Sequence, residues 1–263
     1  MTAHGATTPA RLSQSARQRL GRVSTATLTT QLMRRRLTNC FIPSLTALRP
    51  DLRLVGTAFT LRYVPVRSEL QESTHYDNRT NVQRLAVEQI GPGEVLMVDA
   101  RQEPGAGTLG EILATRMLRR GAAGIVTDGC VRDSAGIRAI DLPCYCRGAH
   151  ASASARRHHP VDLQVPIGCG GVLVMPGDVV VGDEDGVVVF PFELADEVAV
   201  AADEQEQVEA YVRGRIAAGE SIVDTYPPSE RTLADFEEWR RRRSPAEDSR
   251  ADSPGEDPSG AGP

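Results

Sequence analysis

The 263-residue sequence contains no lysine, because all 30 residues of its Lys+Arg count are arginine. This absence excludes catalysis through an imine on a lysine amine, and it excludes a Walker P-loop, whose lysine contacts phosphates. No apolar run reaches the roughly 18 residues of a membrane span, so we expect no transmembrane helix. The N-terminal segment also lacks the apolar core of a secretion signal.

Cysteine is scarce and the charge is mildly acidic. Five cysteines are too few and too scattered for a disulfide scaffold, which favours a reducing, cytoplasmic environment. A net charge of -5 argues against nucleic acid as the main partner. With 40% hydrophobic residues the chain can still bury a core, and we find no internal repeat.

The stretch 105–138 organises the rest of the chain. An apolar segment, 94–101, precedes a glycine-rich turn, a helix expected over about 109–120 and a second strand, GIVTDG. Glu111 opens that helix, and Arg132 and Asp133 follow the second strand. A β-turn-α-β path of this length brings the start of the helix and the end of the strand to one edge. The two carboxylates and the guanidinium would then meet around a small anionic substrate.

Two other interpretations compete for these residues. The run GAGTLG matches the G-x-G-x-x-G dinucleotide fingerprint, but its connection to the preceding strand is long and the chain lacks a second βαβαβ half. Alternatively, Arg132 and Asp133 form only a turn salt bridge, and Glu111 is a favourable charge at a helix N-terminus.

The flanking segments also have recognisable patterns. Ser24 is the expected N-cap of a helix over 25–36, whose closing arginines, Arg34 to Arg36, either suit the negative helix end or form a basic patch for RNA or a partner. We expect one or two strands over 52–66, with a bulge or bend at Gly56, then a polar loop near the site over 67–81 and a short helix over 82–90. A series of hairpins is expected over 161–191 and a long amphipathic helix over 193–218.

Three groups of candidate metal ligands have simpler interpretations. Cys144 and Cys146 are better explained as buried core residues than as a metal pair. The acidic run 183–185 is better explained as a solvated turn than as a cation site. His158 and His159 are expected in a loop, where adjacent side chains diverge.

Several motifs together resemble a known family. The run GEILATRMLRRGAAGIVTDGCVRD, with STATLTTQL, GPGEVLMVDAR and VPIGCGGVLVMPGDVVVGDEDGVVVFP, resembles the RraA-like / class II 4-hydroxy-4-methyl-2-oxoglutarate (HMG/CHA) aldolase family. The resemblance extends from about Val23 to Gly219 and is greatest to longer members labelled ribonuclease activity regulators. It implies a single α/β domain over 15–230, an α-β-β-α sandwich of the swivelling (phosphohistidine-like) type. We expect disordered ends at 1–14 and 240–263, and the composition of 240–263 supports this.

The resemblance also implies a site between the subunits of a homotrimer or homohexamer. Asp133 would hold Mg²⁺ or Mn²⁺ partly through water, and Arg132 would bind the pyruvyl carboxylate and keto oxygen. The turn would close around the pyruvyl group with Gly110, Glu111, Ile112 and Leu113. Glu111 stands where the family usually has aspartate and would position a catalytic water. A neighbouring subunit's carboxylate would approach the metal, with Glu204 and Glu206 as candidates.

The expected activity is therefore metal-dependent retro-aldol cleavage of a 4-hydroxy-2-oxo acid to pyruvate, with oxaloacetate decarboxylation at the same site. Two alternatives stay open. One is a non-catalytic regulator that binds an RNA-degrading enzyme, and the other is a related lyase or hydratase acting on a sugar-derived 2-oxo acid. The sequence does not fix the C4 substituents of the substrate.

Overall fold

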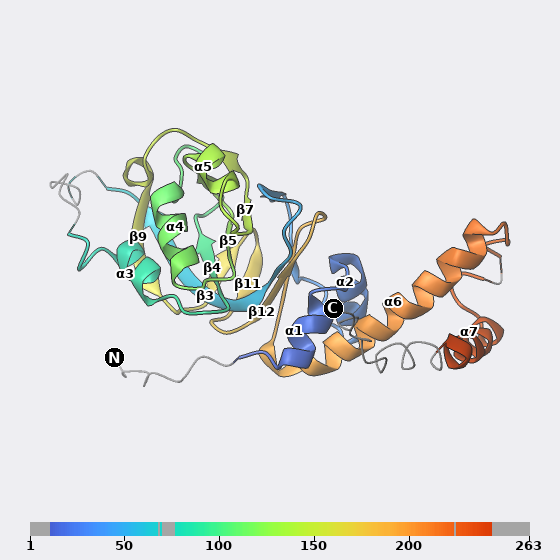
Figure 1. Cartoon of the computed structure of the whole chain (residues 1–263). Helices are drawn as coiled ribbons and strands as arrows, with labels where there is room; N and C mark the ends of the chain where they lie inside the picture. Colours follow the sequence, from blue (N-terminus) through green and yellow to red (C-terminus); the bar gives the residue numbers. More distant parts are fainter. Residues whose placement is uncertain (1–10, 68, 70–76, 224, 244–263) are drawn as a thin grey trace, which may run out of the picture. The chain divides into compact units, whose positions relative to one another are not determined.

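The computed structural model describes residues 11–67, 69, 77–223 and 225–243 (Figure 1). The described residues form two compact units, the first up to Asp203 and the second from Glu204. The single domain expected over 15–230 stays a prediction. Most of the predicted disordered ends, 1–10 and 244–263, lies outside the described residues. Of the remainder, Ser13 caps the first helix and 240–243 belong to the last one.

The helices are α1 (Gln14–Leu20), α2 (Thr25–Arg34), α3 (Val82–Gln89), α4 (Glu111–Arg119), α5 (Ser134–Arg138), α6 (Ala195–Ala217) and α7 (Glu230–Arg243), with short 3-10 turns at Ser154–Arg156 and Phe192–Leu194. In the described part of the chain, no helix combines the length and the apolar character that crossing a bilayer requires.

The strands are β1 (Phe41–Ile42), β2 (Thr46–Ala47), β3 (Leu54–Pro65), β4 (Glu94–Asp99), β5 (Gly124–Thr127), β6 (Cys130–Val131), β7 (Cys144–Cys146), β8 (Gly148–Ala149), β9 (His158–Leu163), β10 (Ile167–Cys169), β11 (Val172–Val174), β12 (Val179–Gly182) and β13 (Val187–Phe190). The main sheet has the order β1-β13-β12-β3-β4-β5-β7-β2, and β9 also pairs with β3. Its centre, β3-β4-β5-β7, is parallel, and the flanking pairs are antiparallel. The predicted mixed α/β class is confirmed, and the finer sandwich description stays a prediction.

The central strands are buried on both faces. Along β4, Leu96 and Val98 contribute to the core under α3, α4 and α5, whereas Val95 and Met97 face a second cluster that includes the β10–β11 hairpin. This alternation follows from the two-residue period of a strand, and two-sided burial explains why β4 reads as a continuous apolar run. Figure 1 shows α3, α4 and α5 together along one side of the sheet.

A third cluster joins α1, α2 and the first turns of α6 to β12 and β13. The predicted N-cap of α2 is confirmed, because the Ser24 hydroxyl accepts a hydrogen bond from the Thr27 N–H at 3.1 Å. The predicted bulge at Gly56 is wrong, because β3 pairs with β12 from Leu54 to Thr57 without a shift in register. Gly56 allows close strand contact instead: a Cβ there would lie 2.5 Å from the Gly93 carbonyl oxygen.

The acidic turn 183–185 is not fully solvated. The Asp183 carboxylate accepts from the Thr25 N–H and hydroxyl, both at 2.7 Å, and pairs with Arg53 at 3.0 Å. It also accepts from the Asp185 N–H. Asp183 therefore ties α2 to the β12–β13 turn, while Glu184 is exposed.

The second unit, described by itself, contains the last part of α6 together with α7. Tyr211, Phe236 and Trp239 pack with ring centroids 5.2 to 6.0 Å apart. Arg215 donates to Asp235 at 3.2 Å and to Glu220. This small aromatic cluster with its ion pairs joins the two helices.

Candidate active site

The candidate site lies in the segments that follow β4 and β5. The Thr108 N–H and hydroxyl both donate to the Cys130 carbonyl, at 2.7 and 2.9 Å, and the Arg132 N–H donates to the Leu109 carbonyl at 2.8 Å. These bonds hold the glycine-rich turn alongside Cys130–Val131. The structure thus brings together the start of α4 and the Arg132–Asp133 pair, as the sequence predicted.

Two positions of this turn, Gly107 and Gly110, require glycine because the side chains of Arg132 and Asp133 pack directly against them. A Cβ on Gly107 would lie 2.4 Å from Arg132 Cγ, and one on Gly110 would lie 2.5 Å from Asp133 Oδ2. Because the glycines of GAGTLG accommodate this chain's own side chains, the structure does not support the dinucleotide interpretation.

A cavity of about 660 Å³ opens beside this turn. It is lined by residues of α3, the turn 107–110, α4 and the Arg132–Asp133 pair. Of the predicted binding residues, Gly110, Ile112, Leu113 and Arg132 line it. Asn78, from the predicted loop 67–81, also lines it, while residues 68 and 70–76 of that loop lie outside the described residues.

Arg132 is the most informative side chain of the site. Its Nε is buried and has no hydrogen-bond partner among the described residues. A buried unpaired guanidinium nitrogen is costly, and an anionic ligand in the cavity would satisfy it.

The start of α4 adds donors to the same cavity. Its N-cap is Gly110, which has no side chain to cap the helix. The first backbone N–H groups of a helix have no intrahelical partner and carry a partial positive charge, which favours an anion. With Arg132 alongside, this part of the cavity suits a carboxylate.

The two predicted carboxylates lie in different surroundings. Asp133 has a left-handed conformation, φ 53° and ψ 40°, and its exposed carboxylate makes no capping hydrogen bond to α5. Glu111 is not among the described residues that line the cavity. Its Oε2 packs on α5, 2.0 Å from the place that a Cβ of Gly136 would occupy.

Asp133 fits a water-rich divalent cation. Magnesium keeps several waters and needs only one or two carboxylates, and Asp133 offers a hard oxygen ligand in no ion pair with a described residue. Within the described residues, no group of three or more His, Cys, Asp or Glu is arranged to hold a metal ion. Asp133 would therefore hold the ion together with water and substrate oxygens.

A second layer of residues supports the turn, and sequence reasoning missed it. The Thr108 carbonyl accepts from Gln83 Nε2 at 2.5 Å and from the Tyr63 hydroxyl at 3.3 Å. His158, predicted in a loop, lies in β9 and is almost fully buried. The one signal for these supporting contacts in the sequence was Gln83, a polar residue among the apolar positions of 82–90.

His158 contacts the turn from behind. Its Nδ1 lies 3.4 Å from Arg101 Nη2, and its Nε2 lies 3.4 Å from the Ala106 carbonyl oxygen. Since arginine only donates and a carbonyl only accepts, the proton belongs on Nε2. Burial is the main cause that lowers the pKa of His158, which keeps the ring neutral.

Cys144 and Cys146 are buried in β7, which confirms their interpretation as core residues. The hydrogen bond to Cys146, and after it burial, raise the pKa of the Cys144 thiol, so this group stays protonated.

The family model for the RraA-like domain, described as Aldolase/RraA, matches residues 23–189, more than half of the chain. The chain belongs to the RraA-like family. The family predicted from the sequence is thereby confirmed.

Relatives of this RraA-like protein carry aldolase names. A protein of Halalkalibacterium halodurans, with the provisional name 4-hydroxy-4-methyl-2-oxoglutarate aldolase, is 38% identical over 106 residues, which are 40% of this chain and 50% of the relative. One from Hahella chejuensis with the same provisional name is 36% identical over 44% of this chain and 70% of its own length. The chain spans about half the length, or less, of the first curated relatives it matches.

Solved structures agree with the fold. Streptomyces coelicolor RraAS2, described as an unusual member of the RNase ES inhibitor RraA protein family, is 34% identical with a TM-score of 0.69. The match covers 78% of this chain and 98% of that one. An uncharacterized Pseudomonas syringae protein is 27% identical with a TM-score of 0.70, over 83% and 99% of the two chains.

Proposed function

We propose that this RraA-like protein is a divalent-metal-dependent lyase that cleaves a 4-hydroxy-2-oxo acid by retro-aldol reaction and releases pyruvate. The main support for the proposal is the Nε of Arg132, which is buried and has no hydrogen-bond partner among the described residues. Arg132 lines a cavity that the start of α4 also lines. An arginine fork is suited to grip a carboxylate with two parallel hydrogen bonds. The aldolase names of the relatives support the same reaction class.

In this proposal Arg132 and the backbone N–H groups at the start of α4 bind the pyruvyl carboxylate. Asp133 holds Mg²⁺ or Mn²⁺, which supplies Lewis-acid polarisation of the keto group when bound. Arg132 also places a positive charge beside the keto oxygen, where negative charge develops. Such preorganised charge is worth roughly 10²–10³ in rate.

The reaction needs one proton removed and one returned. Removal of the 4-hydroxyl proton lets the C3–C4 bond break, its electron pair passes to the keto oxygen as an enolate, and a proton at C3 then gives pyruvate. We assign both transfers to a water held by Glu111, because that carboxylate lies outside the cavity lining. Loss of CO₂ from oxaloacetate breaks the equivalent bond and uses the same enolate stabilisation.

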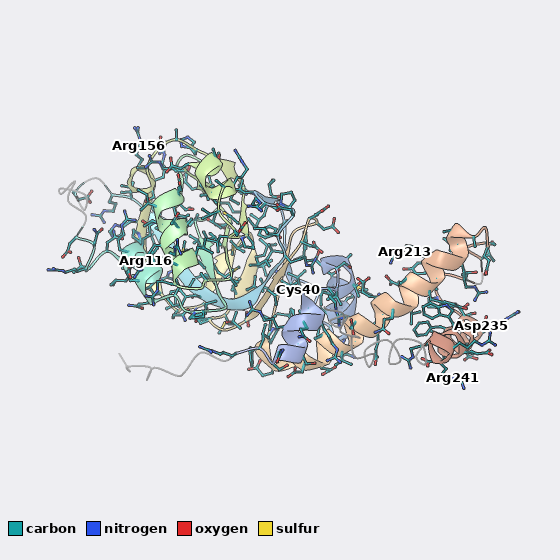
Figure 2. All side chains as sticks on the ribbon, viewed as in Figure 1. Cys40, Arg116, Arg156, Arg213, Asp235 and Arg241 are labelled. Carbon is teal, nitrogen blue, oxygen red and sulfur yellow. The ribbon has the colours of Figure 1, made fainter. Side chains whose placement is uncertain are left out.

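The charges in the cavity lining favour an anionic C4 substituent. Arg84 on α3 lines the cavity, is half-buried and forms no ion pair with a described residue. Arg116 also lines it (labelled in Figure 2), but Glu88 already neutralises it through two hydrogen bonds of 2.9 and 2.7 Å. A second carboxylate on C4 would therefore find Arg84 as its partner.

The test is a pyruvate-release screen over 4-hydroxy-2-oxo acids and oxaloacetate, with Mg²⁺ and with excess EDTA. Arg132→Lys keeps the charge without the fork, and Asp133→Asn removes the anionic ligand. Each should lower kcat/KM by about 10²-fold, roughly 3 kcal/mol, with the melting temperature within a few degrees of wild type. Equal turnover in EDTA would exclude the metal, and equal activity of all three proteins would exclude the assignment.

A second candidate is regulation of an RNA-degrading enzyme by protein contact. It rests on the similarity to RraAS2 over 98% of that protein's length. Arg34 and Arg36 at the end of α2 are exposed, whereas Arg35 pairs with Glu197 at 2.8 Å. Neutralising Arg34 and Arg36 should weaken capture of a ribonuclease partner without changing pyruvate release. Unchanged capture would argue against a contact there.

A further inference from the structure

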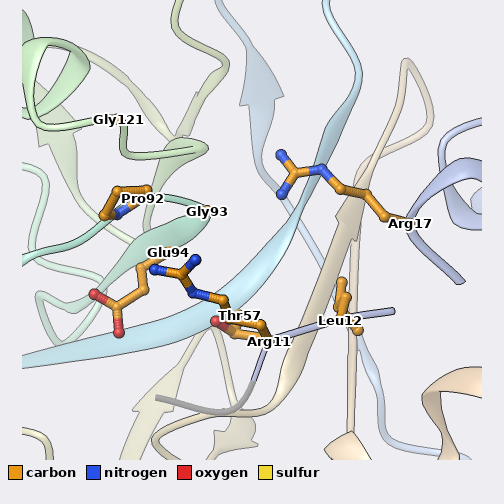
Figure 3. Close-up of a pocket in the computed structure, with 8 residues that line it drawn as sticks. All are labelled: Arg11, Leu12, Arg17, Thr57, Pro92, Gly93, Glu94 and Gly121. Carbon is orange, nitrogen blue, oxygen red and sulfur yellow. The ribbon is translucent and has the colours of Figure 1, made fainter. Parts of the chain in front are cut away.

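A second cavity, of about 330 Å³, lies at the start of β4 and is separate from the candidate active site (Figure 3). Thr57 of β3, the turn that leads into β4, and Gly121 form its walls. Arg11 and Arg17 reach it from α1 and the residues that precede this helix. The active-site residues instead follow the ends of β4 and β5.

The inner wall of this cavity carries unpaired polar groups. Thr57 and Glu94 are only 6% and 7% exposed. One oxygen of Glu94 accepts from the Gly91 N–H at 2.6 Å. The other oxygen and the Thr57 hydroxyl have no hydrogen-bond partner in the described part of the chain, although both residues line the cavity. This wall therefore offers one free acceptor and one hydroxyl group.

Two cations stand at the opening. Figure 3 shows the guanidinium groups of Arg11 and Arg17 turned toward Gly93 and Glu94. Arg17 Nη1 lies 3.1 Å from the point that a Cβ on Gly93 would occupy, so the glycine makes room for it. Neither guanidinium pairs with a carboxylate among the described residues. The cavity thus has two positive groups against one carboxylate.

We propose that this cavity binds a small oxyanion that retains a proton near neutral pH, as inorganic phosphate does in its hydrogen phosphate and dihydrogen phosphate forms. The arginines require acceptor oxygens, whereas the free Glu94 oxygen requires a donor. A fully ionised anion has only acceptor oxygens, so it would repel the Glu94 carboxylate, and this repulsion is unfavourable in a buried site. A protonated oxyanion satisfies both requirements, and the Thr57 hydroxyl can serve as donor or acceptor. This inference is independent of the proposed lyase activity.

The test is calorimetric titration of the full-length chain near neutral pH with inorganic phosphate, sulfate or glycerol 2-phosphate. Sulfate is matched in size and geometry but carries no proton at this pH. Phosphate should bind at least about tenfold more tightly than sulfate. Glycerol 2-phosphate is a monoester with a second pKa of about 6, so most of it carries no proton on phosphorus-bound oxygen and it should bind more weakly than phosphate. Tighter binding of the ester than of phosphate would contradict the role of the retained proton.

The variants assign the roles. Arg11→Gln and Arg17→Gln should each weaken phosphate binding about tenfold or more. Arg119→Gln, an exposed arginine of α4 outside both cavities, is the control and should change nothing. Glu94→Gln replaces the acceptor by an amide donor and should remove the preference for phosphate over sulfate. Thr57→Val keeps the shape and should also weaken phosphate binding, which keeps the proposal testable if Glu94→Gln fails to fold.

Several results would overturn the proposal. They are no binding of either phosphate compound up to about 10 mM, equal affinity of wild type for sulfate and phosphate, or a loss in Arg119→Gln as large as that in Arg17→Gln. An unchanged preference for phosphate in folded Glu94→Gln would refute the role of the retained proton.

Discussion

At the scale of single residues, the close contact between Gly107 and Arg132 should be the most sensitive to substitution. Gly107→Ala would set a methyl group 2.4 Å from Arg132 Cγ and 2.7 Å from its backbone nitrogen, so Arg132 must move. We expect a loss of about 1–3 kcal/mol in stability and at least a tenfold lower kcat/KM. Gly168→Ala is the control, because a Cβ there meets no atom within 4 Å. Normal activity in Gly107→Ala would show that the turn does not position Arg132.

Arg84 tests the C4 substituent. Arg84→Gln should raise KM about tenfold or more for a 4-hydroxy-2-oxo acid with a C4 carboxylate, since it removes a charge-assisted hydrogen bond. The KM of the analogue without that carboxylate should stay the same, because nothing on it faces Arg84. Steady-state pyruvate release with both substrates measures the difference. An equal rise for both would mean that Arg84 supports the cavity wall only.

The sequence predicted part of this site. A β-turn-α-β path constrains where its own ends lie. The sequence alone therefore predicted that Arg132 and Asp133 lie close to the start of α4. The support from Gln83, Tyr63 and His158 could not be predicted, since these contacts join segments 25 to 52 residues apart whose packing no local pattern encodes. The orientation of Glu111 toward Gly136 depends on α5, which the sequence did not predict.

At the scale of secondary-structure elements, Asp183 should contribute strongly to stability. Burial opposes its ionisation, but hydrogen bonds from Thr25 and Asp185 and the charge of Arg53 outweigh burial and lower the pKa of this carboxyl. Asp183→Asn should cost about 1.5–3 kcal/mol and lower the melting temperature, while Glu184→Gln in the same turn should have almost no effect.

The effect of Asp183 should depend on pH. Because its folded-state pKa is depressed, its contribution is fully present above the ordinary aspartate pKa of about 3.9 and is lost as pH falls through the folded value. Denaturant unfolding of wild type and Asp183→Asn should therefore give free energies that differ at neutral pH and converge in acid. A constant difference at all pH values would contradict this assignment.

The elements themselves were predicted unevenly. The helices α2 and α3 have side-chain N-caps, and α2, α3 and α4 all have apolar spacing. These signals act within a few residues, so the positions of the three helices were close to the prediction. The first half of β9, His158 to Pro160, was predicted as a loop, because His-His-Pro carries no strand signal. Its hydrogen-bond partners belong to β3, about 100 residues earlier in the chain. Pairing at that separation overrides local preference.

At the scale of the whole molecule, we predict a homotrimer or homohexamer. One chain supplies a single carboxylate, Asp133, to the proposed metal, and the exposed Ile112 (84%) stands beside Gly110 with its apolar surface in solvent. A neighbouring subunit would cover Ile112 and complete the site. Mass photometry at nanomolar concentration, with pyruvate release on the same sample, should show the trimer or hexamer as the active species. A fully active monomer would contradict the prediction.

The aromatic cluster of the second unit has a consequence for measurement. Trp239 is the sole tryptophan of the sequence and packs with Tyr211 and Phe236, while the buried tyrosines Tyr63 and Tyr145 belong to the first unit. Intrinsic tryptophan emission therefore reports on the α6–α7 cluster and does not report on the unfolding of the first unit, which carries Arg132. If the two units melt separately, emission and far-ultraviolet circular dichroism will give different midpoints for the same protein. A stability screen read by fluorescence alone would then rank variants by the stability of the smaller, second unit and not of the unit that carries Arg132.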